Sequence, residues 1–188
     1  MNDSQELIVR PAVVSDLEPM AEIRRCPEVQ KNQYWLNEAF WLVYSESVIM
    51  AQASGTIQYY VLEVAGAVVG FVTVQTIMYQ KRKYGYFSFN LHPDYWGKGF
   101  MERALRTIFA EFFQEEDNEG AMIECFSSNH QCQRLLAKLS FTPVKVPLAT
   151  RLSMWISHRP IRWIRRFWLS KESWAKLSTT SKLVNLQS

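Results

Sequence analysis

The segment that decides the fold has the sequence LHPDYWGKGFMERAL and covers residues 91–105. Two of the seven glycines of the chain, Gly97 and Gly99, lie here with one residue between them. The residues before this loop, 84–91, are short and aromatic and predict a strand. After the loop, apolar residues recur at the spacing of one helical face and predict an amphipathic helix. The residues of this face are Met101, Ala104, Leu105, Ile108, Phe109 and Phe112.

A glycine loop that leads a strand into a helix is suited to hold an anion. Glycine leaves the backbone uncovered, and the first N–H groups of a helix have no partner inside it. The positive end of the helix dipole favours negative charge there, and Lys98 adds a full positive charge. The loop therefore predicts a ligand that carries phosphates. Because Glu102 stands where G-x-G-x-x-G needs glycine, the dinucleotide motif is absent, and an ordinary strand-to-helix turn is the alternative interpretation.

A second strand and helix follow in the same order. Residues 121–126 predict a strand, and Ser128 and Asn129 are good caps for a helix that begins there. The apolar stripe of this helix consists of Cys132, Leu135, Leu136 and Leu139. Residues 141–144 then predict another extended segment.

Taken together, the order of these segments resembles the GCN5-related N-acetyltransferase (GNAT) superfamily, and within it the branch of ribosomal-protein N-terminal acetyltransferases. The resemblance covers about residues 6–147. Residues 7–17 are similar to the opening strand and first helix of the family, and residues 92–101 are similar to its pyrophosphate loop. Residues 129–141 are similar to its Asn-x-x-Ser helix, with Cys132 at the serine position.

The resemblance implies that acetyl-CoA is the cosubstrate, that no metal takes part, and that an amine attacks the thioester directly. The pyrophosphate is expected on the loop and the pantetheine arm along the strand that ends at Leu91. The cofactor-binding residues implied in this way are Leu91, Trp96, Gly97, Lys98, Gly99, Phe100, Met101 and Asn129.

The catalytic groups are less well defined, because the strand 84–91 contains no acid at the position, near Tyr86, where many family members have a glutamate. The tyrosine that many members use as an acid is replaced by Leu136. We expect Tyr86, Ser88 and Asn90 to order a water that takes the amine proton, and Cys132 to protonate the leaving thiolate. Backbone N–H groups near Asn90 and Leu91 are the expected oxyanion donors. The alternatives are strand packing for the first three, a buried inert thiol for Cys132, and His92 as the base.

The rest of the chain predicts an α+β fold of three layers, α/β/α. Its central sheet is mixed, partly parallel, with six to seven strands and helices on both faces. A capping box at residues 15–18 starts a helix that reaches Arg25, and residues 34–50 predict a second helix. Strands are predicted at residues 6–10, 58–64 and 67–79, the last two as a hairpin.

Composition predicts one catalytic domain, residues 1–157, with a C-terminal segment of different character, residues 158–188. The three cysteines follow no metal-binding spacing, which together with the lack of a signal peptide predicts a cytoplasmic protein. No stretch approaches the roughly twenty apolar residues of a membrane span. The expected acceptor is an amine-bearing small molecule or a peptide N-terminus.

The C-terminal segment is basic and rich in tryptophan. Residues 1–150 hold 13 basic and 17 acidic residues, whereas residues 151–188 hold eight basic residues and one acidic residue. On a helical wheel most apolar residues of 161–175 share one face, although Leu169 does not fit it. The segment therefore predicts a helix that packs on its own domain or on a second copy in a homodimer. A membrane surface and a nucleic acid are the other partners considered. A CoA-binding protein without transferase activity, acting through this segment, is the alternative function.

Overall fold

The computed structural model describes residues 6–33, 38–51, 57–79, 81–145 and 164–185. The strands in chain order are β1 (Leu7–Pro11), β2 (Ile57–Val64), β3 (Ala67–Tyr79), β4 (Arg82–Leu91), β5 (Asn118–Phe126), β6 (Thr142–Val144) and β7 (Ile164–Ser170). The helices are α1 (Leu17–Arg25), α2 (Pro27–Gln30), α3 (Glu38–Ala51), α4 (Phe100–Phe112), α5 (His130–Lys138) and α7 (Lys171–Asn185), with short 3-10 turns at Val14–Asp16 and Pro93–Tyr95.

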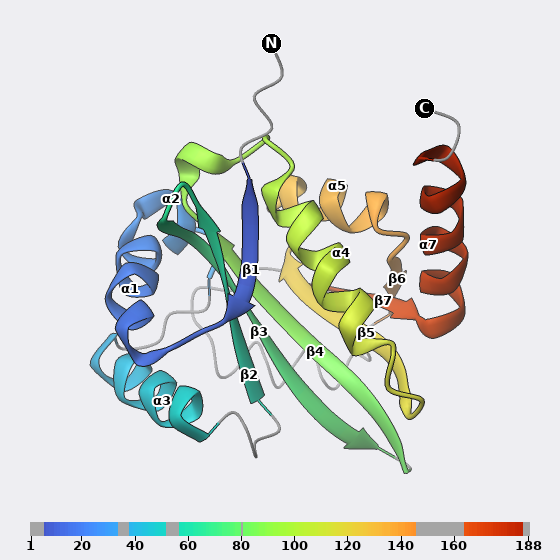
Figure 1. Cartoon of the computed structure of the whole chain (residues 1–188), viewed down its shortest axis with the longest axis horizontal. Coiled ribbons are helices and arrows are strands. Elements are labelled where there is room, and N and C mark those ends of the chain that lie inside the picture. Colours follow the sequence, from blue (N-terminus) through green and yellow to red (C-terminus); the bar gives the residue numbers. More distant parts are fainter. Residues whose placement is uncertain (1–5, 34–37, 52–56, 80, 146–163, 186–188) are drawn as a thin grey trace.

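The described strands form one seven-stranded sheet in the order β1-β2-β3-β4-β5-β7-β6 (Figure 1). The central pair, β4 and β5, is parallel, and the other neighbours are antiparallel. The pairing of β4 with β5 ends at Phe87 opposite Ile123, although β4 continues to Leu91 and β5 to Phe126. Beyond this point β4 pairs only with β3 and β5 only with β7. The two central strands therefore splay apart and leave a fork in the sheet.

Helices cover both faces of the sheet, each over its own hydrophobic core. The buried face of α4, including Leu105, Ile108 and Phe109, packs with residues of α5 and α7 against one face. On the other face α1, α2 and α3 pack against side chains such as Val61 and Phe71 (Figure 1). The predicted three-layer α+β fold with a mixed sheet is confirmed.

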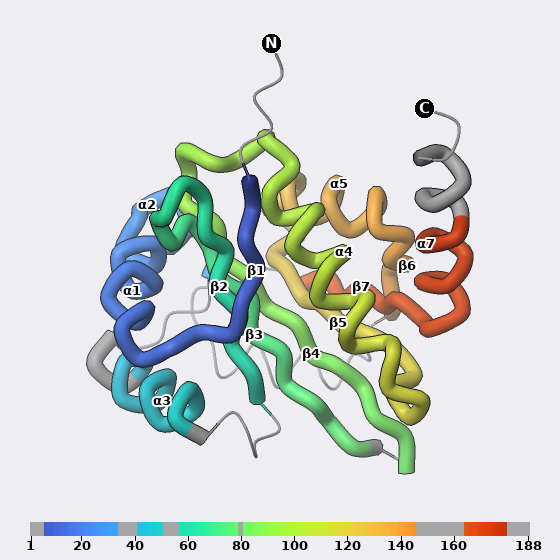
Figure 2. The backbone as a smooth tube through the Cα atoms, in the orientation of Figure 1, coloured from blue at the N-terminus to red at the C-terminus, as the bar shows by residue number. Residues whose placement is uncertain are grey.

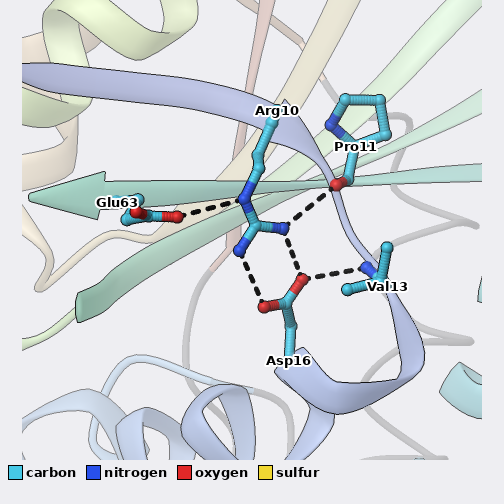
Figure 3. A network of polar contacts seen from close by, with 5 residues as sticks. All are labelled: Arg10, Pro11, Val13, Asp16 and Glu63. Atoms are coloured by element: carbon cyan, nitrogen blue, oxygen red, sulfur yellow. Dashed lines mark hydrogen bonds and ion pairs between the residues drawn. The ribbon is translucent and has the colours of Figure 1, made fainter. Parts of the chain in front are cut away.

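A network of ion pairs ties β1 to the start of α1 (Figure 3). The guanidinium of Arg10 donates to both oxygens of Asp16, at 2.7 and 2.9 Å, and to Glu63 of β2 at 3.1 Å. Asp16 is buried and also accepts from the N–H of Val13. Burial alone raises the pKa of Asp16, but the hydrogen bonds from Arg10 and Val13 outweigh it and leave the pKa below its ordinary value.

This network explains why the predicted capping box does not form. The helix begins at Leu17 with Asp16 as its cap residue, and no side chain caps it. The carboxylate of Asp16 instead faces Arg10, where a charged partner holds it more strongly than the N–H of a helix does. The predicted helix is confirmed, but its predicted capping box at residues 15–18 is wrong.

The C-terminal segment contains a strand of the sheet, β7, before its helix (Figure 2). β7 lies between β5 and β6 and pairs with both. The prediction of a helix is therefore wrong for residues 164–170. The cause is visible in the burial pattern: Phe167 and Leu169 are buried while Arg165 is exposed, an alternation that only a strand gives.

The helical prediction holds for α7, which packs on its own domain. Trp174 is buried and its ring lies 5.7 Å from that of Phe109 and 6.1 Å from that of Phe113. Trp168 covers Gly120, where an added Cβ would come within 2.1 Å of the indole. The predicted boundary between residues 157 and 158, like Trp155 and Trp163, lies outside the described residues.

Candidate functional site

The fork between β4 and β5 opens into a cavity of about 610 Å³. It is lined by β4 and β5 and by the starts of α4 and α5, with α1 and α2 closing one side. All twelve predicted site residues except Lys98 line it. The catalytic candidates among them are Tyr86, Ser88, Asn90 and Cys132, and the cofactor candidates are Leu91, Trp96, Gly97, Gly99, Phe100, Met101 and Asn129. The fold thus brings together residues that the sequence holds in separate segments.

The two glycines of the loop that precedes α4 adopt positive φ, a conformation that glycine tolerates and most other residues do not. Gly97 has φ +75° and Gly99, the cap residue of α4, has φ +77°. The first backbone bond within the helix runs from the N–H of Arg103 to Gly99, and no side chain caps the first turn. A Cβ at either glycine would meet open space. The uncapped N–H groups and this space fit a phosphate-bearing ligand.

Further contacts lie in and beside the loop. The indole Nε1 of Trp96 donates to the carbonyl of Leu91 at 2.7 Å, which ties the loop back to the end of β4. Glu102 in the first turn of α4 pairs with Arg106 at 3.1 Å and with Lys138 at 3.8 Å, so its negative charge is balanced beside the predicted anion site. The ammonium of Lys98 lies over the ring of Tyr95 at 5.4 Å.

The backbone of β4 presents hydrogen-bonding groups to the fork. The N–H of His92 donates to the carbonyl of Val69 on β3, at 2.8 Å. Because N–H groups alternate in direction along a strand, those of Leu91 and Phe89 point the opposite way, toward the fork. Past the last pair with β5, these groups are available to a bound chain that lies along β4.

Asn129 and Cys132 lie together at the start of α5. The side chain of Asn129 accepts from the N–H of Cys132 at 3.0 Å, which makes it the cap of this helix. Cys132 and Cys125 of β5 are both buried beside the cavity. Interaction with the Cys125 thiol, followed by burial, raises the pKa of Cys132, whereas interaction with the Cys132 thiol lowers the pKa of Cys125 in spite of its burial.

The predicted catalytic side chains of β4 share the face of the sheet that α1 and α2 cover. The carbonyl oxygen of the Asn90 side chain accepts from Gln33, next to α2. Ser88 is exposed to the cavity. The hydroxyl of Tyr86 donates to Glu124 of β5 at 3.2 Å. The nitrogen Nδ1 of His92 accepts from the N–H of Asp94 at 3.3 Å, and His92 is not part of the cavity lining.

Glu124 is the functional candidate that the sequence analysis missed. Its side chain is 6 % exposed and lines the cavity. One carboxylate oxygen accepts from Arg166 of β7, at 2.6 Å from Nε, and the other accepts from Tyr86. An acid inside the apolar strand 121–126 was the available signal. The family resemblance predicts an acid on β4, whereas in this protein the parallel neighbour β5 provides one.

Comparisons with known proteins agree with this geometry. The family model described as "Acetyltransferase (GNAT) domain" matches residues 6–142. No curated protein matches the sequence. Among the solved structures that match, the ribosomal-protein-S5-alanine acetyltransferase from Vibrio fischeri has a TM-score of 0.71 at 16% identity, covering 89% of this chain and 94% of that chain.

Two other similar structures broaden the comparison. RimJ from Mycobacterium smegmatis, in complex with CoA-disulfide, has a TM-score of 0.74 at 14% identity and covers 93% of this chain and 89% of that chain. Mutant forms of the spermidine/spermine N-acetyltransferase SpeG from Vibrio cholerae have a TM-score of 0.69 at 16% identity, with 94% and 99% covered. At these identities the likeness shows the fold.

None of the helices in the described part of the chain has the length and hydropathy of a membrane span.

Proposed function

Since the chain belongs to the acetyltransferase (GNAT) family and is an acetyl-CoA-dependent N-acetyltransferase, we propose that its acceptor is a single primary amine, at a peptide N-terminus or on a small molecule. The observation that supports acetyl-CoA as the cosubstrate at this site is the uncapped start of α4, which opens into the fork between β4 and β5. A diphosphate needs unpaired N–H donors, and an extended pantetheine arm needs a free strand edge. Both lie in the same cavity.

For the cofactor, we propose that the N–H groups of residues 99–101 hold the diphosphate. When bound, acetyl-CoA supplies the thioester that the amine attacks. The free edge of β4 orients the extended arm by backbone hydrogen bonds, and the N–H of Leu91 stabilises negative charge that develops on an oxygen in the fork. The hydrogen bond from Trp96 to Leu91 holds the loop against the end of β4.

For proton transfer, we propose that Glu124 accepts the proton of the amine, directly or through a water that Tyr86 and Ser88 hold. The carboxylate lies at the fork, and Arg166 fixes its orientation. Tyr86 donates to the same group, so the phenol and the carboxylate form one polar unit on the acceptor side. The roles of Tyr86, Ser88, Asn90 and Cys132 remain predictions.

The charges around the cavity favour an acceptor with a single amine over a polyamine. The several positive charges of a polyamine are attracted most by carboxylates whose charge no neighbouring cation balances. Among the described residues of the lining, the acids are Glu102 and Glu124, and both are ion-paired with arginine. The lining also carries three basic side chains, Arg24, Arg134 and Lys138. Among the relatives, one is named for a ribosomal-protein alanine and another for spermidine, and the charge favours the first type.

The cofactor assignment is tested by replacing Gly99 with valine and using Gly66→Val as a matched control. Gly66 lies in the β2–β3 turn with φ +79°, and, as at Gly99, a Cβ there meets open space. Both variants therefore carry similar backbone strain, about 1–2 kcal/mol. We expect Gly99→Val alone to weaken acetyl-CoA binding by about tenfold or more, the value of one charge-assisted hydrogen bond. Equal affinities of the two variants, by titration calorimetry, would contradict the assignment.

Turnover distinguishes the transferase from a protein that only binds CoA. We expect the full chain to release CoA thiol from acetyl-CoA in the presence of peptides with a free N-terminus, and to do so less efficiently with spermidine. Tight binding without turnover across a broad panel of amines would support the alternative function. Preference for spermidine would contradict the argument from charge.

A further inference from the structure

A basic side chain lies on the acceptor side of the cavity, where α1, α2 and the segment after α2 face β4. Arg24, in the last turn of α1, lines the cavity and is half-buried. The carbon of its guanidinium lies over the ring of Trp41 on α3, 4.5 Å from the ring centre. A guanidinium has five N–H donors in its plane, and stacking on an indole uses none of them. The indole therefore orients the guanidinium without using its hydrogen-bonding capacity.

The sheet register places Arg24 near the end of β4. Figure 1 shows α1 and α3 on the same face of the sheet. The ring of Trp41 lies 6.0 Å from that of Phe71 on β3. Phe71 stands opposite Asn90 in the antiparallel pairing of β3 with β4, and two residues opposite each other carry their side chains on the same face. Arg24 therefore lies over the face that carries Asn90 and, two residues earlier, Ser88.

We propose that the acceptor is a peptide N-terminus with an acidic side chain at its second or third residue, and that Arg24 binds this carboxylate. The inference rests on the proposed function and names the class of acceptor for the same site. It makes Arg24 a specificity-determining residue, whereas proton transfer stays with Glu124.

The charges on this side of the cavity favour an acidic acceptor. Among the described lining residues of α1, α2, β4 and β5, the charged side chains are Arg24 and Glu124. Glu124 is already balanced by Arg166 of β7. A carboxylate that enters here meets a guanidinium, and the hydrogen bonds between these two groups are charge-assisted and frequently bidentate.

The separation of the two charged side chains selects the position of the carboxylate on the acceptor. Glu124 lies on β5, whereas Arg24 lies by way of Trp41 over β3, with β4 between the two strands. Neighbouring strands are about 4.8 Å apart, so the two side chains are on the order of 10 Å apart across the sheet. An extended peptide advances about 3.5 Å per residue. An acidic side chain on the second or third residue thus reaches Arg24 while the amine lies at Glu124.

Three carboxamides on the same side of the cavity favour a peptide over a small amine. Asn32, Gln33 and Asn90 all line the cavity. Gln33 donates to Asn90, and Asn32 donates to the carbonyl of Glu28 at 3.3 Å. A carboxamide carries a carbonyl acceptor and two N–H donors, so it matches the C=O and N–H groups of a peptide backbone.

The test compares short peptides that are identical except for aspartate or asparagine at the second residue. With the full chain, we expect kcat/KM for release of CoA thiol to be about tenfold or more higher for aspartate, the value of one charge-assisted hydrogen bond. Arg24→Gln should abolish this preference and leave kcat/KM for the asparagine peptide nearly unchanged. Arg25→Gln is the matched control, because Arg25 is the next residue of α1 but pairs with Glu18 at 2.7 Å. This control should keep the preference.

The outcomes separate the inference from the proposed function. If the wild type acetylates both peptides equally well, or if Arg24→Gln keeps the preference, the inference is wrong while the transferase stands. A purely structural role of Arg24 on Trp41 would lower kcat/KM for both peptides alike, which would also overturn the inference. If the wild type binds acetyl-CoA but acetylates no amine, the proposed function itself fails.

Discussion

Replacing Leu169 with alanine should destabilise the whole domain, because β7 is part of its core. Leu169 is 0% exposed and packs in the larger hydrophobic cluster, under α4, α5 and α7. It stands opposite Ala121 of β5, on a strand that has a neighbour on each side. If residues 158–188 formed a segment packed loosely on a finished domain, the same substitution would have little effect on global unfolding.

The magnitude follows from the burial of the side chain. The substitution removes three buried carbon atoms, about 2.4 kcal/mol at ~0.8 kcal/mol each. The space left behind adds to this loss, and buried leucine-to-alanine changes span about 2–5 kcal/mol. We expect a loss of about 3 kcal/mol, which at a urea dependence of ~2 kcal/mol per molar moves the unfolding midpoint down by about 1.5 M.

The assay is equilibrium unfolding in urea, followed by tryptophan fluorescence and by circular dichroism. Val144→Ala on β6 is the control, because Val144 is also an aliphatic residue beside β7 but is 43% exposed. We expect it to cost less than about 1 kcal/mol. The reasoning is refuted if Leu169→Ala costs no more than Val144→Ala, or if the fluorescence change separates from an unchanged transition in circular dichroism.

Three further predictions concern ionisable groups. Burial and the nearby Glu111 raise the pKa of Tyr60 to about 12, so its contribution to stability is present below pH ~10 and is lost as the pH rises through 12. Tyr60→Phe should therefore reduce the fall in the free energy of unfolding between pH 10 and 12, by at most about 2–3 kcal/mol; urea titrations that give the same fall as in the wild type would contradict this. The pKa of Asp16 is below its ordinary 3.8, so its contribution is present above pH ~4 and is lost as the pH falls through the lower native value. Asp16→Asn should cost about 2 kcal/mol at pH 7, since Arg10 keeps a second carboxylate partner, and progressively less as the pH falls below 4; a cost that does not shrink in acid would refute the ion-pair explanation. Glu124→Gln should lower kcat by about 10²–10³-fold with the dissociation constant of acetyl-CoA unchanged; an unchanged kcat would exclude Glu124 as the proton acceptor.

The glycine loop and α4 could be predicted because their signals are local. Gly97 and Gly99 adopt positive φ, which few other residues tolerate, and the apolar face of α4 repeats without a break over three turns. Asn129 was predicted to cap α5 for the same reason, since its partner is only three residues away. Features that depend on residues close in sequence are those that periodicity and capping rules describe.

β7 could not be predicted in this way, because a strand between two others is defined by neighbours far away in the chain. The spacing of the apolar residues in 161–168 fits one face of a helix as well as one face of a strand, so this spacing alone does not distinguish the two. Leu169 was the residue that contradicted the wheel, and it is one of the most deeply buried side chains of the protein. A single apolar residue out of phase is thus evidence for the shorter period of a strand.

The position of Glu124 shows how the sheet assembles the site. In the register of β4 and β5, Phe87 faces Ile123, so continued pairing would set Ser88 beside Glu124. Because the strands separate at this step, the carboxylate stands at the fork, where Tyr86 reaches it from one side and Arg166 from the other. The cofactor loop follows the C-terminal end of β4, beyond the fork. Substitutions at the fork should therefore alter kcat with little effect on cofactor affinity, and substitutions in the loop should alter cofactor affinity with little effect on kcat.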